Sequence, residues 1–156
     1  MRKLRVYVDT CVVGAVFDKG LDWQTKQFWN AVRQRKIIVI VSDLLTDEVE
    51  RAPKRVQDFF RSLPKSQIEH VVSTDESDHL AAQYIAENVV GKSSLDDCRH
   101  VALATLAYAD VLVSWNLKHM ANIERKKGYN GVNLKLGYPQ IEILPPYPLE
   151  VIYAKK

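Results

Sequence analysis

Residues 4–10, Leu-Arg-Val-Tyr-Val-Asp-Thr, decide the fold that this sequence predicts. From Leu4 to Asp9 the side chains alternate between two sides, with Leu4, Val6 and Val8 on one of them, which is the two-residue period of a β-strand. A second stretch, 37–41, is an unbroken run of β-branched residues, typical of a strand buried on both faces. Asp9 is therefore expected at the end of a strand in a buried sheet.

Segments with helical periodicity separate these strands. A short apolar helix is expected over 12–17, and an amphipathic helix over 23–32 places Trp23 and Phe28 on its inner face. Ser42 has the position of an N-cap for a helix that runs to about Arg51, before Pro53. The remaining pattern predicts helices over 54–62, 75–89 and 95–108, strands over 68–72 and 109–115, a less regular tail, and an edge strand over 140–144.

The alternation of strands and helices predicts the fold class. It is typical of an α/β protein with three layers, α/β/α, around a mainly parallel central sheet. The 156 residues fit a single domain over 1–156. Right-handed crossovers bring the carboxyl ends of the strands to one edge of the sheet, and ligands of open α/β sheets bind at that edge.

The composition excludes several classes of protein. Hydrophobic residues make up 47% and charged residues 26%, which is ordinary for a globular protein and argues against disorder. The net charge of +3 is compatible with nucleic acid but does not indicate it alone. Cys11 and Cys98 form no CxxC pair, which disfavours structural zinc. Without a signal-peptide pattern or an apolar run of about 20 residues, we expect a cytoplasmic protein with no membrane partner.

Two acidic residues are candidates for a site at the carboxyl edge. Asp9 either contributes to that site or caps the helix that follows it. On a helical wheel of residues 43–52, Glu48 falls inside the apolar arc that contains Leu45 and Val49. A carboxylate on the core side of a helix is costly unless it is paired or binds a metal. The alternative for Glu48 is a buried salt bridge to a nearby arginine.

A third candidate, Asp97, begins the predicted helix over 95–108. Asp97 shares a helix face with Val101 and Ala104, so it should point toward apolar packing. The alternative is capping, because Ser94 and Asp97 have the spacing of a capping box, as do Ser93 and Asp96. Asp96 lies about 100° round the helix from Asp97, and it is the alternative ligand.

Three carboxylates at one edge point to a metal site. Two bare carboxylates about 4 Å apart repel by roughly 4 kcal/mol at an effective dielectric near 20. Such a cluster therefore needs a bound cation or a shifted proton. Oxygen ligands alone favour Mg²⁺ or Mn²⁺ over zinc. The chemistry that this kind of site serves best is phosphoryl transfer or phosphodiester hydrolysis.

Four motifs resemble those of the PIN-domain nucleases and, among them, the toxin ribonucleases of the VapC type. They are a strand ending in Asp-Thr at 6–10, a Ser…Glu-Val helix at 42–49, Asp-x-x-His-x-Ala-x-Ala at 97–104, and Ala-Asp-x-Leu-Val-Ser at 109–114. The resemblance covers about residues 4–120. One position departs from it, because Asn116 stands where many members have a fourth acid. Asparagine can offer a carbonyl oxygen but no charge, so a second metal ion should bind more weakly.

The resemblance implies a metal-dependent endoribonuclease. Asp9, Glu48 and Asp97 would hold Mg²⁺ or Mn²⁺, which would activate a water for attack on phosphorus. Asn116 would position a water, and Thr10 would orient a ligand or the scissile phosphate. The family also implies a homodimer and a small antitoxin protein as partners. Basic residues would bind the RNA substrate, and the candidates are Arg51, Lys54, Arg55, Lys118, His119 and 125–127, the last run being a solvated helix face in the alternative interpretation.

Other functions compete with this one. The main rival is a PIN-like module that binds RNA or protein without cutting, as the missing fourth acid suggests. A nucleotide-binding or phosphatase-like protein is disfavoured, because no GxGxxG or GxxxxGK[ST] motif follows a strand. A DNA flap nuclease is disfavoured because the chain is too short for a helical arch. We expect four residues near the motifs to serve packing: Cys11, Cys98, His100 and Trp115.

Overall fold

A five-stranded sheet forms the middle layer of the protein, whose computed structural model describes residues 2–147. All neighbouring strands are parallel, in the order β3-β2-β1-β4-β5, so the predicted fold class is confirmed. Residues 1 and 148–156 of the predicted single domain lie outside the described part. The strands are β1 (Leu4–Val8), β2 (Ile37–Ser42), β3 (Ile68–Val71), β4 (Val111–Val113) and β5 (Glu142–Leu144).

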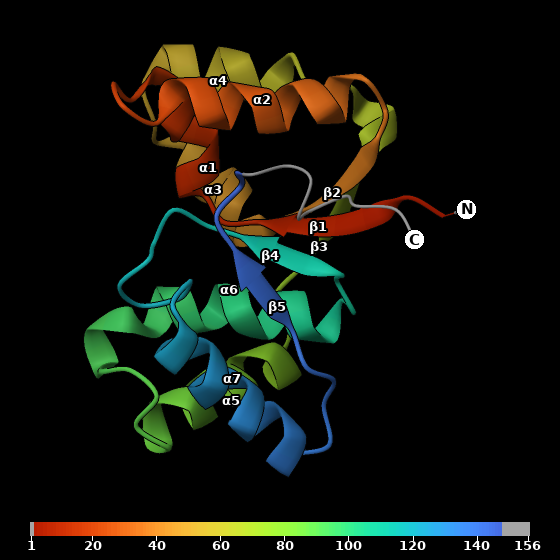
Figure 1. Ribbon diagram of the computed structural model, residues 1–156. Coiled ribbons are helices and arrows are strands. Elements are labelled where there is room, and N and C mark those ends of the chain that lie inside the picture. Colours follow the sequence, from red (N-terminus) through yellow and green to blue (C-terminus); the bar gives the residue numbers. More distant parts are fainter. Residues whose placement is uncertain (1, 148–156) are drawn as a thin grey trace.

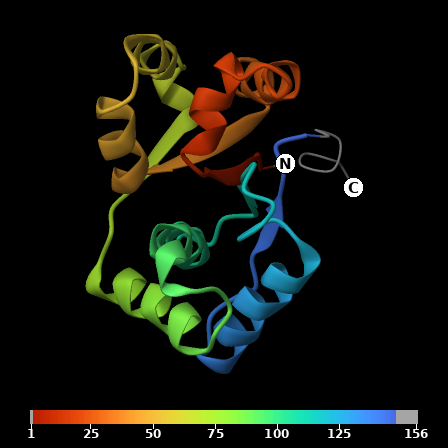
Figure 2. The ribbon, with the colours of Figure 1, turned by 90° about the vertical axis from the view of Figure 1, so that its left-hand side faces the viewer.

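Helices cover both faces of the sheet, as Figures 1 and 2 show. On one face lie α1 (Cys11–Gly14) with the 3₁₀ turn η1 (Ala15–Phe17), α2 (Asp22–Arg33) and α4 (Lys54–Arg61). On the other face lie α5 (Asp75–Ala86), α6 (Leu95–Leu106) and α7 (Ile123–Lys135). The remaining elements, at chain connections, are α3 (Asp43–Glu50), η2 (Lys65–Gln67) and η3 (Lys92–Ser94).

Strand β1 is buried on both of its faces at the centre of the sheet. Val6 and Val8 belong to the apolar cluster that includes α2 and α4, whereas Tyr7 belongs to the cluster that includes α5 and α6. All three side chains are fully buried. The alternation places Tyr7 under α6 and brings Asp9, directly after the strand, to the carboxyl edge of the sheet.

The segments that sequence periodicity predicts form helices and strands, with ends shifted by a few residues. The helix predicted over 95–108 ends at Leu106, and Tyr108 has a positive φ of 55°. The inner face of α2 contains Phe28, Trp29 and Val32, whereas Trp23 is 59% exposed, so its predicted orientation is wrong. Among the described residues, no helix combines the length and the apolarity that crossing a membrane requires.

Helix α7 is the long helix whose extent the sequence pattern did not predict, although the alternative interpretation that placed 125–127 on a helix is confirmed. Its N-cap is Asn122, whose side chain accepts a hydrogen bond from the backbone N–H of Arg125. Two glycines interrupt its apolar pattern, and glycine lowers helix propensity. One of them is required by packing, because a Cβ added at Gly128 would lie 2.8 Å from Cγ1 of Val89.

Candidate active site

Asp9 is buried at the carboxyl end of β1, with 6% of its surface exposed. Its Oδ2 atom accepts a hydrogen bond from the Ser114 hydroxyl at 2.7 Å and a longer one from the Cys11 thiol at 3.3 Å. The helix that follows has Thr10 as its N-cap, and no side chain caps it. The capping interpretation of Asp9 is therefore wrong, and its Oδ1 atom faces the space in front of the sheet edge, toward His100.

Glu48 reaches the same edge from α3, but not in the predicted way. Its side chain is 44% exposed, so the prediction that it faces the core is wrong. Its Oε1 atom accepts a hydrogen bond from the Thr10 hydroxyl at 2.7 Å and lies 3.7 Å from Nε2 of His100. The hydrogen bonds from His100 and Thr10 lower the pKa of Glu48. The alternative, a salt bridge to an arginine, is also wrong, because its ion-pair partner is this histidine.

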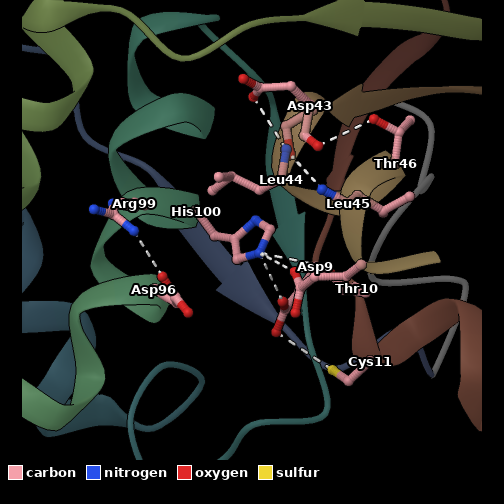
Figure 3. A network of polar contacts seen from close by, with 12 residues as sticks. Asp9, Thr10, Cys11, Asp43, Leu44, Leu45, Thr46, Asp96, Arg99 and His100 are labelled. Carbon is pink, nitrogen blue, oxygen red and sulfur yellow. Dashed lines mark hydrogen bonds and ion pairs between the residues drawn. The ribbon is translucent and has the colours of Figure 1, made fainter. Parts of the chain in front are cut away.

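Asp97 and Asp96 point in different directions from the first turn of α6. The Ser94 side chain makes no capping hydrogen bond, so the capping-box interpretation is wrong. Burial and, after it, the negative charge of Asp9 raise the pKa of Asp97. The Asp96 side chain is 79% exposed and pairs with Arg99 at 2.9 Å, as Figure 3 shows.

His100 lies between the carboxylates, and the sequence analysis missed this. It is 3% exposed, and its Nε2 atom lies 3.5 Å from Oδ1 of Asp9. Figure 3 shows the ring directed at Asp9 and Thr10. Burial lowers the pKa of His100, but the hydrogen bond to Glu48 and the nearby acidic charges outweigh burial, so the net shift is upward. The sequence feature that could have indicated a role for His100 is its position three residues after Asp97, because residues with this spacing are neighbours on a helix face.

Asn116 adjoins the acidic residues from the loop after β4. Its Oδ1 atom accepts a hydrogen bond from the backbone N–H of His119 at 3.0 Å, and its own backbone N–H donates to the Ser114 hydroxyl at 2.9 Å. The Asn116 side chain also lowers the pKa of the Asp97 carboxyl, though less than burial raises it. The His119 N–H occupies one of the two lone pairs of Oδ1, so the expected role of this carbonyl oxygen stays a prediction, and the amide NH₂ is a second group that could donate at the site.

The predicted RNA-binding residues lie in different surroundings. Arg51 lines a cleft of about 270 Å³ that also contains Glu48 and Arg99. Lys118 is exposed, and His119 is half-buried with its Nδ1 atom buried and lacking a hydrogen-bond partner among the described residues. Other predicted cations have partners of their own: Lys54 pairs with Asp58, Arg55 lies over the Phe17 ring, Arg125 donates to the carbonyls of Val89 and Lys118, and Lys126 pairs with Glu142.

The packing predictions for the other residues have mixed outcomes. Cys98 is buried in the apolar cluster that contains Tyr7, and Trp115 packs against the cluster on the other face of the sheet, where its Nε1 atom donates to the Thr25 hydroxyl. Cys11 is exposed as a residue, but its thiol contacts Asp9. Burial and the charge of Asp9 raise the pKa of the Cys11 thiol to about 12, so it is not a thiolate ligand at neutral pH.

The carboxylate oxygens at this edge are of the type that binds a hard divalent cation, but they are not arranged as the ligands of one. In residues 2–147, no three His, Cys, Asp or Glu side chains are arranged to hold a metal ion as they stand. The carboxylates of Asp9 and Asp97 nevertheless repel each other, which is part of the reason that the pKa of Asp97 is raised. A cation between oxygen donors would relieve this repulsion, and such donors suit Mg²⁺ or Mn²⁺.

The fold of this chain is similar to that of a known structure, although the two amino-acid sequences have low identity. No protein-family model and no curated protein matches this sequence. The structure is similar to a chain of VapBC2 from Rickettsia felis, determined bound to a DNA fragment from the VapBC2 promoter. The TM-score is 0.57 at 13% identity, and the match covers 91% of this chain and 98% of the other. At this identity the likeness concerns the fold, and the chain has a three-layer, PIN-like α/β/α fold.

Proposed function

We propose that this protein is a metal-dependent endoribonuclease that hydrolyses RNA phosphodiester bonds. One observation supports the proposal: at the carboxyl edge of the sheet, Asp9 and Glu48 from separate elements both lie beside Nε2 of His100, and the charge of Asp9 raises the pKa of Asp97 on a third element. Within residues 2–147, none of Asp9, Glu48 and Asp97 forms an ion pair with a lysine or arginine, and His100 is the ion-pair partner of the first two. Acidic side chains that are left without such cations indicate a site for an external cation rather than a structural contact.

The proposed roles follow the contacts of each residue. Asp9, Glu48 and Asp97 would hold Mg²⁺ or Mn²⁺, and the ion would supply an activated water and neutralise charge on the phosphate. The Ser114 hydroxyl orients Asp9, and the Thr10 hydroxyl orients Glu48. The NH₂ group of Asn116 would donate to a water or a phosphate oxygen beside Asp97.

Substrate binding would depend on cations near this edge. Arg51 lines the cleft next to Glu48, and Lys118 is exposed in the loop that follows Asn116. Arg51, Lys118 and the exposed part of the half-buried His119 would contact phosphate groups on either side of the scissile bond, whereas the buried Nδ1 atom of His119 would not. Because phosphate contacts release counterions, RNA binding should weaken steeply as the salt concentration rises.

We also propose that the protein is the toxin of a type II toxin–antitoxin pair. Two observations support this: the four motifs that resemble VapC-type toxins, and the similarity in fold to a chain of VapBC2. The proposal includes a small antitoxin partner, a homodimer, a single domain and a cytoplasmic location. Coexpression with the gene that lies next to its own would test the partner, because an antitoxin should copurify and suppress cleavage.

The first experiment is cleavage of a labelled single-stranded RNA pool in Mn²⁺, Mg²⁺ or EDTA. The Asp9→Ala variant removes a proposed ligand, and the Glu87→Ala variant is a control, because Glu87 is an acid that pairs with Lys135 away from the site. We expect cleavage by the wild type and the control only with metal, and none by Asp9→Ala. Equal cleavage by wild type and Asp9→Ala would contradict the proposal.

A second candidate is a PIN-like module that binds RNA or protein without cutting. Two observations favour it. Asn116 occupies the position where many family members have a fourth acidic residue, and His100 already lies between two of the carboxylates. In that case wild type and Asp9→Ala would both bind RNA, and neither would cut it in any metal. The same RNA pool, analysed by gel shift as well as by cleavage, separates the two functions.

A further inference from the structure

We propose that His100 is a positioning residue of the acidic site, and that Tyr7 holds its imidazole ring in place. The proposal rests on the proposed function and deepens it, because it says how the carboxylates are kept at a common site. Neither residue was assigned a role by the motifs, and His100 was expected only to pack.

The first step is the environment of Nε2. This atom lies 3.5 Å from Oδ1 of Asp9, 3.7 Å from Oε1 of Glu48 and 3.5 Å from the Thr10 hydroxyl. An unprotonated nitrogen would present a lone pair to two carboxylates and be repelled. The Thr10 hydroxyl donates its hydrogen to Glu48, so its oxygen accepts from Nε2, which therefore carries a hydrogen and presents that hydrogen to the side of Asp9 and Glu48.

The second step is the other side of the ring. Nδ1 lies 2.8 Å from the hydroxyl of Tyr7, and the two rings meet edge to face with centroids 5.7 Å apart. Tyr7 is fully buried in β1, so its hydroxyl has little freedom to move. In the neutral imidazole, the Tyr7 hydroxyl donates to Nδ1, and that contact fixes the hydrogen on Nε2.

The third step is connectivity. Tyr7 lies two residues before Asp9 on the same strand, and His100 lies three residues after Asp97 on the same helix. The Tyr7–His100 contact therefore ties β1 to α6, and Nε2 extends the tie to Glu48 on α3. Donors that orient carboxylate ligands from behind are worth about 10- to 100-fold in metal affinity or activity.

Mn²⁺ affinity, measured by calorimetry, tests this role without relying on cleavage. His100→Leu removes the donor, and we expect about 10- to 100-fold weaker binding. His100→Gln keeps an N–H donor and should restore most of the affinity. Tyr7→Phe should weaken binding by a smaller factor. Tyr84→Phe is the matched control, because Tyr84 is also fully buried but its hydroxyl donates to Asn133, outside the site.

Opposite results would overturn the proposal. Tighter Mn²⁺ binding by His100→Leu would show that the imidazole competes with the ion instead of positioning its ligands. Equal losses in Tyr7→Phe and Tyr84→Phe would show a general effect of removing a buried hydroxyl. Since His100→Leu is the variant most at risk of misfolding, the conservative His100→Gln and Tyr7→Phe variants carry the comparison if it fails to fold.

A second measurement uses the metal-free protein, so that failure of the proposed function is distinguishable. Nitrogen NMR of histidine-labelled protein reports which ring nitrogen of His100 carries hydrogen. We expect a protonated Nε2 in the wild type and a loss of this fixed state in Tyr7→Phe. An unprotonated Nε2 would overturn the positioning role. A protonated Nε2 in a protein that binds no Mn²⁺ would reject the metal site and leave the positioning role standing.

Discussion

The acidic side chains at the two edges of the parallel sheet have different kinds of partner. At the amino edge, Arg2 pairs with Asp110 and Arg5 pairs with Glu69, both at 2.8 Å. Asp110 also accepts a hydrogen bond from the backbone N–H of Arg5 at 2.8 Å. At the carboxyl edge, Asp9 and Glu48 have no lysine or arginine partner among the described residues and lie 3.5 and 3.7 Å from Nε2 of His100.

The same kind of side chain therefore has opposite properties at the two edges. The Arg2 guanidinium lowers the pKa of Asp110, whereas burial and the charge of Asp9 raise the pKa of Asp97. The charge of Asp110 favours the folded state, and the charge of Asp97 opposes it. This difference separates a stabilising contact from a candidate site more clearly than burial does, because proteins retain uncompensated charge mainly where function requires it.

The largest expected effect is loss of RNA cleavage in Asp9→Asn. A loss of about 4 kcal/mol of metal-dependent stabilisation corresponds to a roughly thousandfold slower reaction. The free energy of unfolding should change little without metal, because asparagine keeps an acceptor for Ser114 and removes a charge near Asp97. Cleavage rates and urea unfolding measure the two quantities. A cleavage rate within tenfold of the wild type would contradict the comparison.

Asp110→Asn should show the reverse pattern. Weakening the charge-assisted bond to the Arg5 backbone N–H is expected to cost about 1 to 2 kcal/mol of stability, with cleavage unchanged at temperatures where the variant is folded. Because the folded-state pKa of Asp110 is lowered, its contribution is complete above the ordinary aspartate pKa and is lost as the pH falls through the folded value.

Urea unfolding of wild type and Asp110→Asn between pH 7 and pH 2 checks this prediction. The stability difference between the two should be constant near neutral pH and shrink in acid. A difference that grows in acid would mean that Asp110 is not a stabilising anion, and the contrast between the two edges would fail.

Asn116→Asp makes the carboxyl edge more acidic. The new carboxylate can still accept the His119 N–H, but its second oxygen would replace an NH₂ donor and add a negative charge that the pKa of Asp97 already shows to be unfavourable at this edge. We expect lower stability in EDTA, about tenfold tighter Mn²⁺ binding and faster cleavage. Thermal unfolding with and without Mn²⁺ measures this, since ligand binding to the folded state raises the melting temperature. A variant that Mn²⁺ does not stabilise beyond the wild type would contradict the proposed ligand set.

The sequence predicts the sheet better than it predicts the last helix. The strands at 4–9 and 37–41 can be predicted because alternation and β-branching are local properties of the sequence. Helix α7 contains Gly128 and Gly131, and the reason for Gly128 is its contact with Val89. That contact joins residues far apart in the chain, so no local pattern contains it.

In the candidate site, too, some features can be predicted from the local sequence and others depend on contacts between distant residues. The position of Asp9 follows from the end of a strand, which periodicity gives. The direction of Glu48 was predicted wrongly, because a helical wheel describes where a side chain starts and not where a long side chain ends. The role of His100 depends on Tyr7 and Asp9 from another element, and the orientation of Asn116 depends on the turn that presents the His119 N–H.

The smallest expected effect is a gain in stability from Asp97→Asn. Asp97 is a half-buried carboxylate whose pKa is raised by burial and by the charge of Asp9, so removing its charge in EDTA should stabilise the fold by up to about 1 kcal/mol, the size of one partly exposed charge interaction. Asp96→Asn is the matched comparison, because Asp96 instead pairs with Arg99 and should lose a few tenths of a kcal/mol or nothing. Urea unfolding of both variants in EDTA measures the sign. If Asp97→Asn is destabilised as Asp110→Asn is, the acids at the carboxyl edge are structural partners, and the case for a cation site there fails.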